Sequence, residues 1–174
     1  MIKNVSKWIM LLGIFAFLLP SCTSTRRTPN RSSTAAKGAK NSEEVQLRKD
    51  LVRYAYRYEG AKYQYGGNGP RFDCSGLTTK IYDNFNIQLP RTSSAQAAVG
   101  KKIPTPQARP GDLAFFSKGK SGGRINHVAL VVDNDRQGLV VIHSTTSRGV
   151  VIDNIHQSSY WKSRLLYVRQ VIGN

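Results

Sequence analysis

Cysteine is scarce in this chain, which has only Cys22 and Cys74 among its 174 residues. Neither cysteine belongs to a close Cys-x-x-Cys pair, so the spacing offers no zinc-ligand motif of that kind. A disulfide between the two would tie the N-terminal segment to the rest of the protein and would block both thiols. Otherwise Cys74 is unpaired, and its role has to be sought in its chemistry.

Long hydrophobic runs are also missing, because the longest apolar stretch, Trp8 to Leu19, is shorter than the roughly 20 residues that span a bilayer. Lys3 and Lys7 precede this stretch, which is typical of a signal peptide. The stretch ends in Leu19-Pro-Ser-Cys22, which resembles the lipobox of bacterial lipoproteins.

We therefore expect residues 1–22 to be a lipoprotein signal peptide with Cys22 as the lipid anchor. A plain cleaved secretory signal is the alternative. A lipid on Cys22 would hold the protein to a membrane of the cell envelope, which is the outer membrane facing the periplasm if the source is Gram-negative. An unpaired Cys74 in an exported protein is then most simply explained by catalysis.

Acidic residues are few, with 10 Asp and Glu against 26 Lys and Arg, and the formal net charge is +16. From Leu51 onward the chain has 17 basic and 7 acidic residues, a net charge of +10. The basic residues are scattered singly, without a cluster interleaved with aromatic residues, so we expect no nucleic-acid partner. Anionic polymers of the cell envelope and lipid headgroups fit this charge better.

Residues 23–41 have almost no apolar side chains, and this composition predicts a disordered tether. The remainder, residues 42–174, has the length of one domain with its own core. Helical spacing of apolar residues predicts helices over Glu43–Tyr58, from Cys74 to about Asn86, and over Arg91–Ala98.

Short β-rich runs follow Pro110-Gly111 and are separated by clusters of Gly, Asp, Asn and Ser. Helices followed by consecutive strands indicate an α+β domain, with the N-terminal helices packed on a roughly five-stranded antiparallel sheet. The predicted strands are 112–117, 126–132, 139–144, 150–155 and 165–172.

Cys74 lies where a turn rich in Gly and Pro gives way to a helix. Free backbone N–H groups and the helix dipole stabilise a thiolate at such a position, so we expect the pKa of Cys74 to be lowered. The alternative is a buried structural cysteine that acts as a small hydrophobic residue. The polar neighbours Asp73 and Ser75 favour the reactive thiol.

Two of the three histidines flank a predicted hairpin whose loop is Asp133–Gly138. If the turn centres on Asp135, His127 and His143 lie directly opposite each other and project to the same face of the sheet. With Cys74 they would form a cysteine nucleophile, its base, and a residue that orients the base. A zinc site built from one Cys and two His is the alternative, which the spacing does not favour. His156 receives no role.

Six motifs, taken together and in this order, resemble the NlpC-type family of papain-like cell-wall cysteine peptidases. The match extends over essentially the whole predicted domain. The motifs are Tyr63-Gln-Tyr-Gly-Gly67, Phe72-Asp-Cys-Ser-Gly-Leu77, Leu89-Pro-Arg-Thr-Ser93, Pro110-Gly-Asp-Leu113, Asn126-His-Val-Ala129 and Val141-Ile-His143.

This resemblance implies a papain-like fold and hydrolysis of peptidoglycan stem peptides or cross-links. By position it implies that Cys74 is the nucleophile, His127 the base, His143 the orienting residue and Tyr63 a neighbour of the oxyanion. It further implies substrate-binding roles for Asp73, Ser75 and Arg91, of which the first two match positions that bind a free amine in some members. No metal or other cofactor is expected.

Two other functions remain open. One is a catalytically inactive wall-binding lipoprotein, which the positive charge and the tether would also suit. The other is an amidase or acyltransferase with the same Cys-His geometry. In each case we expect a monomer whose partners are peptidoglycan and a membrane.

Overall fold

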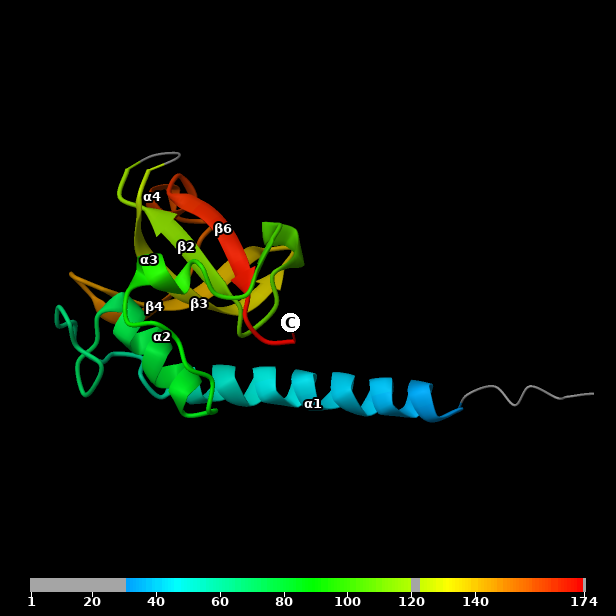
Figure 1. The fold of residues 1–174 in the computed structure, drawn as a ribbon. Coiled ribbons are helices and arrows are strands. Elements are labelled where there is room, and N and C mark those ends of the chain that lie inside the picture. The colour runs from blue at the N-terminus through cyan, green and yellow to red at the C-terminus, as the bar shows by residue number, and fades with distance from the viewer. Residues whose placement is uncertain (1–30, 120–122, 174) are drawn as a thin grey trace, which may run out of the picture.

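The computed structural model describes residues 31–119 and 123–173. In this part of the chain, the helices formed by residues 31–96 lie along one side of an antiparallel sheet, and the long first helix extends past the edge of the sheet (Figure 1). The α+β class expected from the order of elements is therefore confirmed. The signal peptide, the lipobox and Cys22 lie outside the described residues.

The first helix, α1 (Arg31–Tyr56), begins earlier than predicted. Residues 31–41 are helical, so the prediction of a disordered tether is wrong for this segment. The segment contains several alanines and lysines, which are good helix formers, and extending an existing helix costs far less than nucleating a new one. Composition alone ignores that cooperativity. No described helix has the length and apolar character needed to cross a membrane.

The other described helices are short. Helix α2 (Cys74–Asp83) begins at the predicted residue, and α3 (Ser93–Gln96) has Thr92 as its N-cap. A 3₁₀ turn, η1 (Thr105–Gln107), follows. Helix α4 (Ser159–Lys162) was not predicted, because a single turn carries too little periodicity to be recognised.

The sheet has six strands in the order β1-β6-β2-β3-β4-β5, and all its neighbours are antiparallel. Five strands match the predicted ones within a few residues. The unpredicted strand, β1, has only three residues, two of them exposed, and therefore shows no apolar alternation. The strands are β1 (Lys101–Ile103), β2 (Leu113–Ser117), β3 (Ile125–Asp135), β4 (Gly138–Thr145), β5 (Gly149–Asn154) and β6 (Leu165–Gln170).

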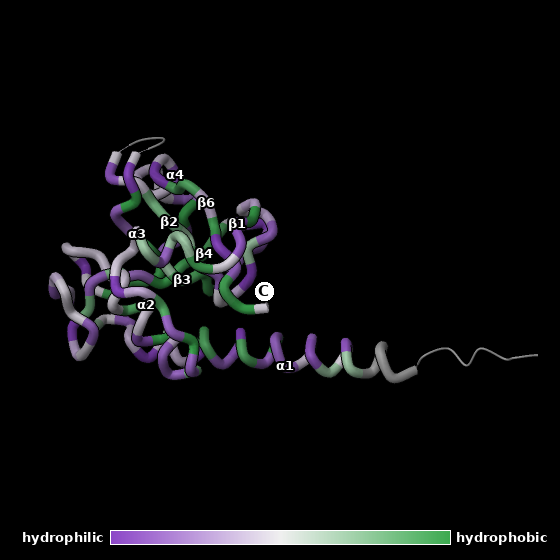
Figure 2. The backbone as a smooth tube through the Cα atoms, viewed as in Figure 1, coloured by the Kyte–Doolittle hydropathy of each residue, from purple (hydrophilic) through white to green (hydrophobic). Residues whose placement is uncertain are grey.

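The sheet buries side chains on both faces. Leu113 and Phe115 of β2 pack in the core beneath the helices, whereas the alternate residues Ala114 and Phe116 pack in a second cluster on the opposite face. Figure 2 shows that hydrophobic residues concentrate in the strands, whereas the N-terminal half of α1 has few. The central strands are thus fixed from both sides, and side chains at their ends are held in defined positions.

A buried ion pair anchors α1 to the sheet. Arg48, with 4% of its surface exposed, donates from Nη1 to Oδ1 of the fully buried Asp112 at 2.8 Å. Arg48 also donates from Nε to Glu44 at 2.9 Å and from Nη2 to the Ile172 carbonyl at 2.7 Å. Asp112, which the sequence placed in a motif, therefore has a structural partner.

Candidate active site

Cys74 is the first residue of α2, and the sequence around it explains why the helix begins there. The preceding residue, Asp73, has extended backbone geometry and caps the helix by accepting from the Gly76 N–H at 2.6 Å. Cys74 is partly exposed. The position predicted for the thiol at a helix start is confirmed.

Close packing of two glycines holds this helix start against the preceding loop. A Cβ at Gly76 would overlap the carbonyl oxygen of Gly67 and would lie 2.9 Å from Asp73 Oδ1. The same Gly67 carbonyl accepts from the Asp73 N–H at 3.1 Å. The glycine two residues after Cys74 is therefore required by space, since any side chain would push the loop away from the helix.

We expect Gly76→Ala to destabilise the fold by about 1–3 kcal/mol and to reduce any activity of the site, because the loop and Cys74 must shift apart. Thermal unfolding and a hydrolysis assay measure the two effects. Gly38→Ala is the matched control, since a Cβ there meets nothing within 4 Å in helix α1. Equal behaviour of the two variants would contradict this account of the helix start.

His127 on β3 and His143 on β4 form a hydrogen-bonded pair. His127 Nε2 and His143 Nδ1 are 2.9 Å apart, and the two ring centroids are 5.1 Å apart. His143 is fully buried and His127 partly exposed. The expectation that the two imidazoles share one face of the sheet and lie side by side is therefore confirmed.

The strand register differs from the prediction in an informative way. The turn centres between Arg136 and Gln137, not on Asp135, and β3 contains a bulge between Val131 and Asp133. Beyond the bulge Leu130 pairs with Ile142, so His143 lies opposite Ala129 and diagonally across from His127. The predicted direct opposition is wrong by two residues.

The bulge at Val132 is what keeps the two histidines on one face. The shifted turn alone would change the register by an odd number of residues and place His127 on the opposite face from His143. The extra residue in β3 restores an even shift. The prediction that His127 and His143 share one face is therefore correct, although the predicted turn position and strand register are not.

Burial controls the charge of both histidines. The pKa of His127 lies well below its ordinary value because burial disfavours the imidazolium, and the neighbouring His143 adds to the effect. Burial also lowers the pKa of His143, against an opposing contribution from Asp153. Both rings are therefore neutral at pH 7.

The expected lowering of the Cys74 pKa is wrong for the resting site. Burial raises the pKa of the thiol, although backbone N–H groups of Val128, Ser75 and Cys74 itself act in the opposite direction. Val128 follows His127 on β3, and Cys74 and His127 line the same cleft. A neutral thiol thus faces a neutral imidazole, which can accept its proton without changing the net charge of the site.

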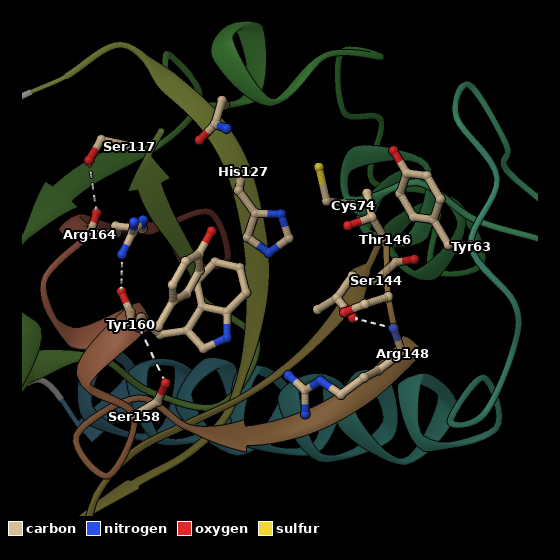
Figure 3. Close-up of a pocket in the computed structure, with 14 residues that line it drawn as sticks. Tyr63, Cys74, Ser117, His127, Ser144, Thr146, Arg148, Ser158, Tyr160 and Arg164 are labelled. Atoms are coloured by element: carbon tan, nitrogen blue, oxygen red, sulfur yellow. Dashed lines mark hydrogen bonds between the residues drawn. The ribbon is translucent and has the colours of Figure 1, made fainter. Parts of the chain in front are cut away.

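Cys74 and His127 share a cleft of about 620 Å³. Figure 3 shows both side chains at its centre, with Tyr63 beside Cys74 and Arg148 and Arg164 farther out. Among the described residues, the lining includes two arginines and no Asp or Glu, and most of the remaining polar side chains carry hydroxyl groups. The lining residues are Tyr63, Cys74, Ser117, Asn126, His127, Ser144–Arg148, Ser158, Tyr160, Trp161 and Arg164.

Trp161 of α4 was not among the predicted site residues, although it covers the histidine pair. Its ring stacks on His127 at 4.8 Å between centroids and meets the His143 ring edge-on at 4.7 Å. The only signal in the sequence is the aromatic pair Tyr160-Trp161, which gives no spacing to the histidines. Stacking holds the His127 ring in the plane in which one nitrogen faces His143.

Asp73, Ser75 and Arg91 lie together beside Cys74, in a second pocket of about 420 Å³ that Tyr63 also lines. Arg91 Nη2 donates to Asp73 Oδ2 at 2.7 Å, and Nη1 donates to Asp73 Oδ1 and to the Ser75 hydroxyl, both at 3.0 Å. The backbone N–H groups of Gly66 and Gly76 also donate hydrogen bonds to the Asp73 carboxylate. A substrate amine would have to displace Arg91, and a substrate-binding role for the three remains a prediction.

Tyr63 lines both pockets, as expected for a residue near the reacting atoms. Burial and the nearby Cys74 and Asp73 raise the pKa of its phenol, so the hydroxyl keeps its proton and can donate.

Within residues 31–119 and 123–173, no group of three or more His, Cys, Asp or Glu side chains is arranged to hold a metal ion.

The fold and the cleft define an α+β protein in which a cysteine at a helix start shares a cleft with a histidine that is hydrogen-bonded to a second histidine on the adjacent strand. The sequence pattern of the NlpC/P60 family matches residues 60–170, more than half of the chain. The chain therefore belongs to the NlpC/P60 family.

Several relatives illustrate this membership. A gamma-DL-glutamyl hydrolase from Bacillus subtilis is 30% identical over 99% of this chain, which spans only 38% of that protein. The Escherichia coli protein described as probable endopeptidase NlpC is 33% identical over 88% of this chain and 96% of its own length. A crystal structure of an NlpC/P60 family protein from Bacillus cereus has a TM-score of 0.65 at 29% identity, covering 72% of this chain and 40% of that one.

Proposed function

We propose that this protein is a cell-wall cysteine peptidase that hydrolyses the stem peptides or cross-links of peptidoglycan. The observation that carries the proposal is the shared cleft, where Cys74 at the start of α2 meets the hydrogen-bonded pair of His127 and His143. Family membership and the relatives named as endopeptidases support it. Two arginines and no acidic residue in the lining suit an anionic polymer.

In the proposed mechanism Cys74 Sγ passes its proton to His127 and attacks a peptide carbonyl, and backbone N–H groups at the start of α2 stabilise the oxyanion together with Tyr63. An acyl-enzyme forms when His127 protonates the leaving amine. His127 then takes a proton from a water molecule whose oxygen attacks the acyl carbon. The C–S bond breaks, the product leaves and the proton returns to Cys74 Sγ, while His143 holds the ring throughout.

Digestion of purified peptidoglycan and of defined muropeptides, followed by mass spectrometry of the fragments, tests the proposal. The name of the Bacillus subtilis relative directs attention to γ-glutamyl bonds, so new ends at such a bond are the expected product. Fragments cut only at the sugar–peptide amide would indicate an amidase, and acyl transfer to an added amine would indicate an acyltransferase. Intact substrate after prolonged incubation would favour an inactive wall-binding protein.

The pH dependence of hydrolysis follows from the charge of His127. The ring must be neutral to act as a base, and its pKa lies well below 6.5. Activity should therefore be retained as pH falls to 6 and should be lost only below the ordinary pKa of histidine. The acid limb of kcat/KM measured on a soluble muropeptide reports this value, and a limb at or above pH 6.5 would contradict the assignment.

We also propose that a lipid on Cys22 holds the protein in the cell envelope. The support is the pattern of an apolar run ending in Leu19-Pro-Ser-Cys22. Mass spectrometry of the N-terminal peptide from cells of the source organism would show the lipid. An unmodified residue 22, or a mature chain that begins after it, would exclude the anchor.

A further inference from the structure

A carboxylate lies behind the histidine pair, on the side away from Cys74. Asp153 of β5 has its Oδ2 atom 2.9 Å from His143 Nε2. Arg148 holds the same carboxylate from outside, donating from Nη1 to Oδ1 at 3.0 Å and from Nη2 to Oδ2 at 2.5 Å. The chain thus contains a hydrogen-bonded series from Arg148 through Asp153 and His143 to His127.

The sheet register builds this series. His143 pairs with Val151 of β5, so Asp153, two residues farther along, projects to the same face as His143. His143 is fully buried, and the Asp153 side chain is 17% exposed. The carboxylate therefore closes the inner nitrogen of His143 off from bulk water.

The charge of Asp153 sets the direction of each hydrogen bond. Its hydrogen bonds to His143 and Arg148 lower the pKa of Asp153, so the group is an ionised carboxylate and can only accept. His143 Nε2 must then carry the proton. Because burial keeps His143 neutral, its Nδ1 atom is bare and must accept from the His127 Nε2–H.

This sequence of donors and acceptors determines the state of the reactive nitrogen. A neutral His127 that carries its proton on Nε2 has a bare Nδ1. Nδ1 is the remaining ring nitrogen, and Figure 3 shows the His127 ring next to the Cys74 sulfur. The nitrogen left for the thiol is thus an acceptor, as a general base requires.

We propose that Asp153 is a positioning residue that, held by Arg148, fixes the tautomer of His143 and through it that of His127. The inference rests on the proposed function, because it concerns the base of that reaction. Only one proton moves in the step it prepares, from Cys74 Sγ to His127 Nδ1 and later to the leaving amine. Asp153 remains ionised throughout.

The β4–β5 turn does not depend on Asp153 for its shape. Thr145 Oγ1 donates to the Gly149 carbonyl at 3.1 Å and accepts from the Arg148 N–H at 3.2 Å. Backbone bonds between Val150 and the segment 60–61 attach the start of β5 to the loop after α1. These contacts separate a role in positioning from a merely structural one.

Nitrogen-15 NMR of the histidine rings in the unmodified protein at pH 7 is the first test, and it needs no substrate. We expect both His127 and His143 as neutral Nε2–H tautomers. A proton on His143 Nδ1, or a charged His143, would overturn the proposal even if the protein hydrolyses peptidoglycan. Conversely, a protein without activity could still show the expected tautomers, so failure of the proposed function is recognised separately.

Asp153→Asn is the second test, because an amide can accept from Nε2–H or donate to a bare Nε2 and so no longer selects one tautomer of His143. We expect kcat to fall about 10- to 100-fold with little change in KM, mixed ring tautomers, and an acid limb moved to lower pH, since loss of the anion disfavours the imidazolium. Among the described residues, Asp153 and Arg148 act on the His143 ring and His143 acts on the His127 ring. The other charged or titratable groups that line the cleft with His127 are Cys74, Tyr63, Tyr160 and Arg164.

Asp135→Asn in the exposed β3–β4 turn is the matched control and should leave kcat, the ring tautomers and the acid limb unchanged.

Arg148→Gln keeps the hydrogen bond between His143 and Asp153 but removes the guanidinium that holds the carboxylate from outside. We therefore expect a smaller loss of kcat than in Asp153→Asn, with the tautomers retained. If Asp153→Asn lowers only the melting temperature, with tautomers and pH profile as in the unmodified protein, Asp153 is structural and the proposal fails.

Discussion

Replacing Cys74 with alanine should reduce the hydrolysis of peptidoglycan by roughly 10⁴-fold or more, because no acyl-enzyme can form and the remaining groups contribute only binding and oxyanion stabilisation. The side chain is small and partly exposed, so the fold should persist. Release of muropeptides from purified peptidoglycan measures the loss.

Two controls accompany this variant. Circular dichroism and thermal unfolding should match those of the unmodified protein, which shows that the loss is chemical. Cys74→Ser should be nearly as inactive, since a hydroxyl is a much weaker nucleophile than a thiol beside a neutral imidazole. Turnover of Cys74→Ala within a factor of ten of the unmodified protein would exclude the proposed mechanism.

The largest effect on stability should come from Arg48→Ala, at about 3–5 kcal/mol of unfolding free energy, because the variant leaves Asp112 buried without its charged partner. Urea denaturation measures the change. Burial already raises the pKa of Asp112 even with Arg48 present. Removing the Arg48 guanidinium leaves only the Arg109 N–H and the Arg109 charge to offset the burial of this carboxyl group.

The double variant Arg48→Met with Asp112→Leu is the informative comparison. It removes both charges and keeps most of the volume, so it should be less destabilised than Arg48→Ala alone. Arg53→Ala, which removes an exposed ion pair on the same helix, should cost no more than about 1 kcal/mol. Equal free energies of unfolding for Arg48→Ala and Arg53→Ala would contradict the claim that the buried pair of Arg48 and Asp112 anchors α1.

The site could be predicted from the sequence where one local pattern determines it. The glycines and proline before Cys74, followed by apolar residues at every fourth position, located the start of α2 at the observed residue. The hairpin signal likewise identified the strands that carry His127 and His143 as neighbours. Both inferences use periodicity within a single element or between neighbouring strands, which short-range sterics enforce.

Features that depend on register or on tertiary contacts could not be predicted in this way. The bulge at Val132 has no sequence signature, yet it decides which face His127 occupies. The contact between Asp153 and His143 requires the register of β4 against β5, and Trp161 reaches both rings through a single helical turn. Each of these is fixed by packing across the sheet.

For the pKa of Cys74, burial outweighs the effect of the helix start. A helix start favours the thiolate, and backbone N–H groups act in that direction, but desolvation of the sulfur is the larger contribution. The extent of burial cannot be inferred from the sequence around residue 74. Ionisation of the Cys74 thiol in the folded protein therefore depends more on proton transfer to His127 than on stabilisation of the thiolate by the helix start.

The central claim is that Cys74 and His127 act as one unit, and the pH dependence of Cys74 alkylation by iodoacetamide tests it most directly. Intact-protein mass spectrometry follows the reaction in the unmodified protein and in His127→Ala, with His156→Ala as the control. We predict labelling at pH 7 in the unmodified protein and in the control, whereas His127→Ala should require a pH above the ordinary thiol range. Identical alkylation profiles for all three proteins would contradict the account.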